Sequence, residues 1–150
     1  MRVGRRIRTA LLVIGLTVLL PGLALRIYMG SGAEDRLKPG EADVVQVYEN
    51  FSGPAVASLI DLGLCPPGAD AGSFMTLPNL IAPAGALPVN TAGGNLAEGF
   101  VHGIGLVLEA VRQIRGTSPN QVPGADISLL LGGPVAPLVS ATVFGSAATL

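Results

Sequence analysis

Apolar residues recur at three- and four-residue spacing between Leu96 and Ile114, which is the pattern of one helix face. The apolar stripe consists of Leu96, Phe100, Ile104, Val107, Leu108, Val111 and Ile114. The polar residues Glu109, Arg112, Gln113 and Arg115 fall outside that stripe. Gly116 suits the left-handed conformation that ends many helices. We therefore predict a helix over 96–115 and expect it to be the most buried helix of the fold.

A glycine-rich loop, Asn90-Thr91-Ala92-Gly93-Gly94, directly precedes this helix. Such a loop at a helix N-terminus gathers free backbone N–H groups near one point. That arrangement suits an anion, or an oxygen that becomes negative during a reaction. A tight loop before a core helix is the alternative interpretation.

A strand pattern and a helix pattern follow one another earlier in the chain. Residues 43–48 are rich in valine and predict a buried strand. A polar turn follows, in which Asn50 or Ser52 can cap a helix over 54–62 that ends at Gly63. The side chains expected to point inward from this helix are those of Val56, Leu59 and Ile60.

The remaining apolar runs predict two more strands, over 125–131 and 138–144, joined by a hairpin-like return through 132–137. Residues 64–89 carry repeated proline and glycine with little periodicity, and connections this long are usually functional or disordered. The order of elements predicts an α/β fold in which residues 42–144 form a mixed sheet flanked by helices.

Residues 1–35 have a different character from the rest. Four arginines, at positions 2, 5, 6 and 8, precede an uncharged run over residues 9–25 that Pro21 interrupts. Basic residues followed by apolar ones are typical of a signal peptide or a membrane anchor. A core helix and a start foreign to the fold are the alternatives. We treat 1–35 as an apolar segment with a linker and 36–150 as one domain.

Composition narrows the choice of function. The chain is 49% apolar, has no tryptophan and carries a net charge of −1, which argues against a nucleic-acid partner. One cysteine and one histidine argue against an internal disulfide or a conventional zinc site. We therefore expect no metal and no resident cofactor.

Three stretches, 44–65, 87–116 and 121–137, together resemble the C-terminal half of a thiolase. Within that acetyl-CoA acetyltransferase superfamily they look like the lipid-transfer-protein and sterol-carrier-protein-X branch, which is similar to the steroid side-chain aldolases. The resemblance implies a thiolase-fold half whose active site lies against a second, amino-terminal half. The nucleophilic cysteine of thiolases belongs to that other half.

The resemblance also implies site residues. Tyr48 stands where thiolases carry the first residue of an Asn- or His-Glu-Ala-Phe motif, and the aldolase-like relatives also have tyrosine there. Asn90, Gly93 and Gly94 match an Asn-x-x-Gly-Gly motif near the substrate. Phe100 takes the place of the histidine of Gly-His-Pro, which stabilises the thioester oxyanion. We assign Tyr48 a catalytic role and the other four residues a place in substrate binding.

The third motif departs further from thiolases. Leu130-Leu131-Gly132-Gly133 replaces a Cys-x-Gly motif whose cysteine is the acid/base, so Gly132 and Gly133 are kept as substrate-binding candidates. Neither Leu130 nor Phe100 can move a proton.

Three further residues carry weaker predictions. His102 is either a structural histidine, a partner contact or a displaced acid/base, and on a regular helix it would lie ~200° around from Phe100. Cys65 is expected to be a small apolar side chain, and Glu49 a capping group.

Three functions remain in competition. The first is half of a thiolase-like enzyme that cleaves a CoA thioester, acyl- or steroid-CoA, by a Claisen-type or retro-aldol reaction. Its partners would be the amino-terminal half or a second copy, together with a small OB-fold protein, in the cytoplasm. The second is a non-catalytic remnant or partner-binding module. The third is a lipid-handling protein that contacts the membrane through residues 9–25.

Overall fold

A mixed three-stranded sheet forms the centre of the fold. The computed structural model describes residues 18–20, 23–25, 38–65, 70–132 and 140–149. The strands β3 (Val44–Val47), β4 (Ile127–Gly132) and β5 (Ser140–Gly145) lie in the order β3-β4-β5. β3 pairs with β4 in parallel, and β4 pairs with β5 antiparallel. The predicted α/β fold with a mixed sheet and flanking helices is confirmed.

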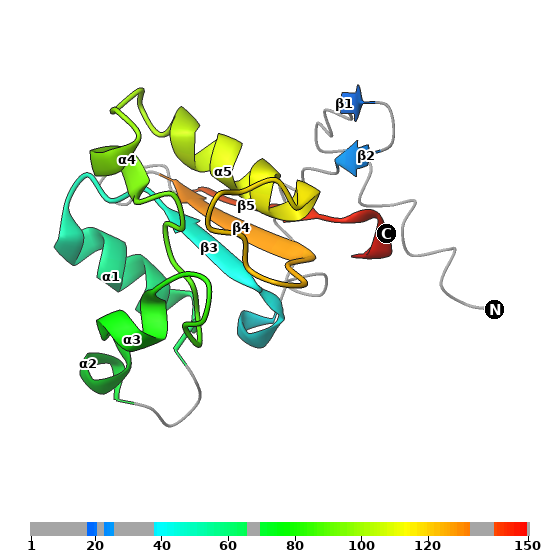
Figure 1. Cartoon of the computed structure of the whole chain (residues 1–150). Helices are drawn as coiled ribbons and strands as arrows, with labels where there is room; N and C mark the ends of the chain where they lie inside the picture. The colour runs from blue at the N-terminus through cyan, green and yellow to red at the C-terminus, as the bar shows by residue number, and fades with distance from the viewer. Residues whose placement is uncertain (1–17, 21–22, 26–37, 66–69, 133–139, 150) are drawn as a thin grey trace.

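Helices cover both faces of this sheet (Figure 1). The helix α5 (Ile104–Arg115) lies on one face, and α1 (Ser52–Asp61) lies on the other beside the one-turn helices α2 (Ala71–Phe74) and α3 (Leu77–Leu80). All four residues of β3 are buried, as expected of a parallel strand covered on both sides. Alternate residues of β3 and β4 therefore pack against different helices.

Of the three side chains predicted to point inward from α1, the structure buries only that of Leu59. Ala55 and Leu59 are buried, whereas Val56 and Ile60 are 38% and 42% exposed. The sequence does not single out the buried face because apolar and small side chains surround most of this helix. No side chain caps its N-terminus; Asn50 Oδ1 instead accepts a hydrogen bond from the neighbouring backbone N–H. Gly63, at φ 67°, ends the helix as predicted.

The connection over 64–89 is packed in its described part rather than irregular throughout. Phe74 and Leu87 enter the core cluster beneath β3. Asp70 caps α2 by accepting hydrogen bonds from Ser73, and the Ser73 side-chain hydrogen bond is the main cause of a lowered pKa of Asp70. The segment ends along β3, where Val45 donates to the carbonyl of residue 88 and accepts from the N–H of residue 90.

The predicted helix over 96–115 is wrong in its first half. The structure has a one-turn helix α4 (Gly94–Ala97), then a turn over 98–103, and only then α5. Positive φ at Gly99, His102 and Gly103 interrupts the helix. The break separates the first part of the stripe from the second, so Leu96 is 96% exposed and Phe100 is 55% exposed.

Polar side chains share the buried face of α5 with apolar ones. The buried residues of α5 are Leu106, Glu109, Ala110, Gln113 and Ile114. Ile104 and Leu108, which the stripe placed inside, are exposed. The phase of the helix differs from the prediction because Gln113 and the Oε1 atom of Glu109 form hydrogen bonds to each other and to Thr91. Among the described helices, α5 nevertheless buries the most residues.

Most of the amino-terminal segment 1–35 lies outside the described residues. Its described parts are two short strands, β1 (Val18–Leu20) and β2 (Leu23–Leu25), which pair antiparallel. No helix among the described residues is long and apolar enough to cross a bilayer. Two 3-10 turns, η3 (Pro39–Glu41) and η4 (Ala147–Thr149), complete the described elements.

Candidate functional site

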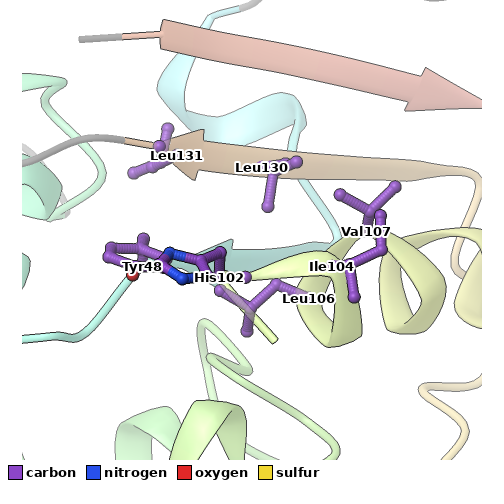
Figure 2. A pocket seen from close by; sticks show the side chains of 9 residues that line it. Tyr48, His102, Ile104, Leu106, Val107, Leu130 and Leu131 are labelled. Carbon is purple, nitrogen blue, oxygen red and sulfur yellow. The ribbon is translucent and has the colours of Figure 1, made fainter. Parts of the chain in front are cut away.

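An open cavity of about 320 Å³ lies where the ends of β3 and β4 meet the beginning of α5. Tyr48 enters it directly after β3, and Leu130–Gly132 line it from β4. His102 and the first turn of α5 close it on the other side (Figure 2). The walls are mainly apolar, and Tyr48 and His102 supply side-chain groups able to exchange a proton. The cavity therefore suits an apolar body that presents a polar group to these two residues.

Three ring side chains, Tyr48, Phe100 and His102, gather beside this cavity; we call them the aromatic group. The Tyr48 and Phe100 ring centroids are 6.1 Å apart, and those of Phe100 and His102 are 5.1 Å apart. Both pairs are tilted, which is a favourable arrangement for aromatic rings. The prediction that His102 lies on the far side of a helix from Phe100 is wrong, because the turn over 98–103 is not helical.

Gly103 fixes the position of the Tyr48 ring. A Cβ at residue 103 would come within 2.7 Å of Tyr48 Cδ2, and Gly103 has φ 82°. Only glycine accommodates both the conformation and this close approach at low cost. The backbone before α5 therefore serves as one wall against which Tyr48 rests.

The Asn90 side chain is engaged within the protein rather than directed into the cavity. It accepts a hydrogen bond from the Val47 N–H at 2.8 Å and donates to the Val47 carbonyl at 3.0 Å. Both bonds involve the residue that immediately precedes Tyr48. Asn90 itself has φ 48°, a conformation that costs energy outside glycine. Its observed contacts therefore hold the end of β3.

The glycine loop binds a carboxylate of its own chain. Glu49 accepts hydrogen bonds from the Asn95 backbone N–H and from Asn95 Nδ2. Gly94 packs directly against the Glu49 carboxylate, and Gly93 adopts φ 89° at the start of α4. Glu49 is thus a capping group, as predicted. The place where the sequence suggested an external anion is filled by this side chain.

Of the other residues that the sequence analysis named, some line the cavity and others do not. Gly132 lines it at the end of β4, and Gly133 lies outside the described residues. Leu130 lines the cavity where thiolases would place a thiol. Cys65 is half-buried against the core cluster and is not among the cavity residues. Leu106 and Val107 also line the cavity, a role that the sequence did not indicate because the predicted helix began earlier and placed both residues near its middle.

Replacing Asn90 by alanine is expected to destabilise the protein by about 2–4 kcal/mol. Two hydrogen bonds are lost at about 0.5–1.5 kcal/mol each, and alanine at a positive φ adds about 1 kcal/mol. Asn90→Gly should lose less because glycine removes the backbone strain. The measurement is urea unfolding of the full chain. Asn50→Ala is the matched control, since that exposed side chain accepts one local hydrogen bond; equal losses at both positions would contradict the assignment.

Comparison with known proteins gives a consistent result. A family model described as "Thiolase C-terminal domain-like" matches residues 31–144. The chain is 37% identical over 101 residues to the 17-hydroxy-3-oxo-4-pregnene-20-carboxyl-CoA lyase of Mycobacterium tuberculosis, covering 67% of this chain and 26% of that protein. It is 38% identical over 99 residues to a steroid side-chain-cleaving aldolase of Thermomonospora curvata, covering 66% and 25% of the two chains.

A solved structure agrees with these sequence matches. The "Ltp2-ChsH2(DUF35) aldolase" superposes with a TM-score of 0.64 at 34% identity and covers 73% of this chain and 28% of that chain. The present chain therefore spans about a quarter of the length of the relatives that it matches.

Proposed function

Because this chain belongs to the thiolase C-terminal domain-like family, we propose that it supplies one half of an active site that cleaves a carbon–carbon bond in a CoA thioester of lipid or steroid degradation. The observation that carries this proposal is the cavity at the ends of β3 and β4, where the Tyr48 phenol and the His102 imidazole face mainly apolar walls. The CoA thioester is the substrate, and the reaction uses no resident cofactor.

The chemistry of the cavity favours a retro-aldol reaction over thiolysis. Thiolysis needs a thiol nucleophile, an acid/base and donors for the thioester oxygen. Leu130 and Phe100 occupy the positions of the last two, and a hydrocarbon side chain can neither donate nor accept a proton. A retro-aldol cleavage needs only proton exchange and stabilisation of an enolate.

In the proposed step, the β-hydroxyl of the thioester gives its proton to the phenolate form of Tyr48, and its C–O bond becomes a carbonyl; the proton then held by Tyr48 is available for the α-carbon. The bond between the α- and β-carbons breaks, and its electron pair forms the thioester enolate. A proton at the α-carbon then completes a shortened acyl-CoA beside a ketone or aldehyde. His102, at the rim of the cavity, is the second proton-exchanging group of this chain.

The relatives' names guide the choice of substrate and partners. The lyase is named for a 17-hydroxy-pregnene carboxyl-CoA and the aldolase for steroid side-chain cleavage, so we propose a steroid-type β-hydroxyacyl-CoA. The chain corresponds to about a quarter of these proteins, so the missing part of the site would come from an amino-terminal half. The structure named for an Ltp2-ChsH2 pair supports a further partner protein.

An apolar surface is available for the amino-terminal half. Large side chains at the surface of α4, the 98–103 turn and α5 are those of Leu96, Phe100, Val101, Ile104 and Leu108. Such patches on monomers are usually limited to a few hundred Å² and otherwise mark interaction sites.

We expect the isolated chain to self-associate. Size-exclusion chromatography with light scattering should show aggregates for the full chain. Leu96→Glu combined with Leu108→Lys should reduce them, because both side chains lie on this exposed apolar surface. Ala57→Ser, at an exposed position of α1 away from this surface, is the control and should aggregate like the unaltered chain. A monodisperse unaltered monomer would contradict the proposed interface.

Reconstitution tests the proposed function. The full chain is mixed with the lyase of Mycobacterium tuberculosis truncated before the stretch that this chain matches, and cleavage of 17-hydroxy-3-oxo-4-pregnene-20-carboxyl-CoA is followed. We expect cleavage only when both polypeptides are present. A stable complex without cleavage would favour the non-catalytic, partner-binding alternative.

A further inference from the structure

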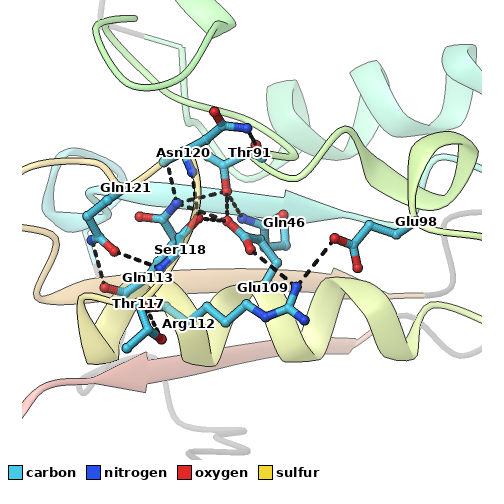
Figure 3. Close-up of polar contacts among 10 residues, drawn as sticks. All are labelled: Gln46, Thr91, Glu98, Glu109, Arg112, Gln113, Thr117, Ser118, Asn120 and Gln121. Carbon is cyan, nitrogen blue, oxygen red and sulfur yellow. Dashed lines mark hydrogen bonds and ion pairs between the residues drawn. The ribbon is translucent and has the colours of Figure 1, made fainter.

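A buried carboxylate lies between the two segments that carry the aromatic group. Glu109 on α5 is fully buried, and its Oε1 accepts hydrogen bonds from three side chains. The donors are Thr91 Oγ1 at 2.5 Å, Ser118 Oγ at 2.7 Å and Gln113 Nε2 at 2.9 Å. Figure 3 shows these polar groups converging above α5 from the Asn90 loop and the turn after the helix. A buried charge placed among so many fixed donors holds those segments in one arrangement.

One series of contacts, which we call the first arm, connects Glu109 to the residues beside Tyr48. Thr91 bonds to Glu109 and also accepts from Gln46 Nε2 on β3 at 3.0 Å. Its neighbour Asn90 forms side-chain hydrogen bonds with the backbone N–H and carbonyl of Val47, the residue before Tyr48. The anchored Thr91 thereby keeps Asn90 in its unfavourable positive-φ conformation.

A second series of contacts, the second arm, connects Glu109 to the turn that carries Phe100 and His102. Glu109 Oε2 has no hydrogen-bond partner among the described residues, and it lies 4.0 Å from Arg112 NH1. The same guanidinium nitrogen lies 3.3 Å from Glu98 Oε1 (Figure 3). Glu98 begins the turn over 98–103 that carries both rings.

We propose that Glu109 is a positioning residue for the aromatic group, with Oε1 acting on Tyr48 through Thr91 and Asn90 and Oε2 acting on Phe100 and His102 through Arg112 and Glu98. The inference rests on the proposed function for its catalytic meaning. The geometry of the rings can nevertheless be measured without any substrate.

The chain offers well-separated probes for each arm. His102 is the only histidine, and Tyr48 is one of two tyrosines, so a Tyr28→Phe background leaves a single signal of each kind. The full chain is labelled with ¹³C in histidine and tyrosine rings, and ring resonances are recorded alone and with the unlabelled amino-terminal half.

Each arm is broken by one substitution and has a matched control. Thr91→Val should displace the Tyr48 resonances, whereas Thr91→Ser keeps the hydroxyl and should not. Arg112→Met should displace the His102 resonances, whereas Arg115→Met on the same helix should not. Glu109→Gln should behave like Thr91→Ser at Tyr48 and like Arg112→Met at His102, because an amide keeps one acceptor and loses the charge. If Thr91→Val fails to fold, Asn90→Gly, which removes both side-chain hydrogen bonds to Val47, should displace the Tyr48 resonances instead.

The kinetic measurement uses the reconstituted protein. Thr91→Val should lower kcat about 10²-fold with little change in KM, because a loss of this order is expected when a reacting group is misplaced. Unmoved Tyr48 resonances in Thr91→Val, or equal effects of Arg112→Met and Arg115→Met on His102, would overturn the proposal. Ring shifts without cleavage by any form of the protein would leave the positioning role standing and remove the proposed function.

Discussion

Tyr48→Phe is expected to reduce cleavage by the reconstituted protein about 10²–10⁴-fold, the usual contribution of one general acid/base. Phenylalanine keeps the ring that packs against Gly103 and Phe100, so the fold should be preserved. Among the described residues, the Tyr48 hydroxyl donates to no protein group, and its loss should therefore cost little stability. The measurement compares kcat with the unfolding midpoint of the same variant.

Tyr28→Phe is the matched control for this substitution, because Tyr28 is the other tyrosine of the chain and lies before the matched family region. It should leave kcat unchanged. A Tyr48→Phe protein that retains cleavage within a factor of a few would remove Tyr48 from the mechanism, and the apolar cavity would then have only His102 as a proton-exchanging group.

The chain alone is expected to show no thiolysis of acetoacetyl-CoA or of a longer 3-ketoacyl-CoA. Losing one oxyanion donor commonly costs ~10²–10³ in rate, and losing a general acid/base costs a further ~10²–10⁴. In the resemblance to thiolases, Phe100 and Leu130 align with these two positions, and Cys65 packs against the core cluster and does not line the cavity. The assay follows thioester consumption with added CoA and compares the chain with Cys65→Ala.

Thiolysis above the Cys65→Ala level would identify Cys65 as a nucleophile. That result would also contradict the alignment of Leu130 and Phe100 with the thiolase motifs. Equal, background rates for both proteins agree with the proposed retro-aldol chemistry.

The strands of the sheet could be predicted from the sequence because their signals are local. The valine run before Tyr48 and the leucine run before Gly132 each give a buried strand whatever lies elsewhere in the chain. The order of elements and the resemblance to thiolases predicted only a mixed sheet, and the structure adds that these two strands pair in parallel.

The course of the chain from Leu96 to Ile114 could not be predicted in the same way. The three- and four-residue spacing continues through Gly99, His102 and Gly103, although their positive φ values stop the helix. Tertiary contacts determine this break, since Gly103 must leave room for the Tyr48 ring. The helix propensity of the flanking residues is overridden there.

Glu109 was assigned outside the buried face for a related reason. A periodicity argument treats a charged residue as solvent-exposed, whereas this carboxylate is enclosed by donors from three other positions in the sequence. Those donors are 18, 4 and 9 residues from Glu109 in the sequence, so no local sequence pattern predicts the cluster. The burial of such polar groups is difficult to predict from a sequence pattern, and departures from the local pattern are expected at functional sites.

Product analysis of the reconstituted protein tests the central claim most directly. The full chain and the truncated lyase are incubated with 17-hydroxy-3-oxo-4-pregnene-20-carboxyl-CoA, with and without added free CoA, and the products are identified by mass spectrometry. The account predicts a ketosteroid and one shortened acyl-CoA in equal amounts, independent of free CoA and lost in Tyr48→Phe. Two acyl-CoA products that require free CoA, or cleavage unaffected by Tyr48→Phe, would contradict it.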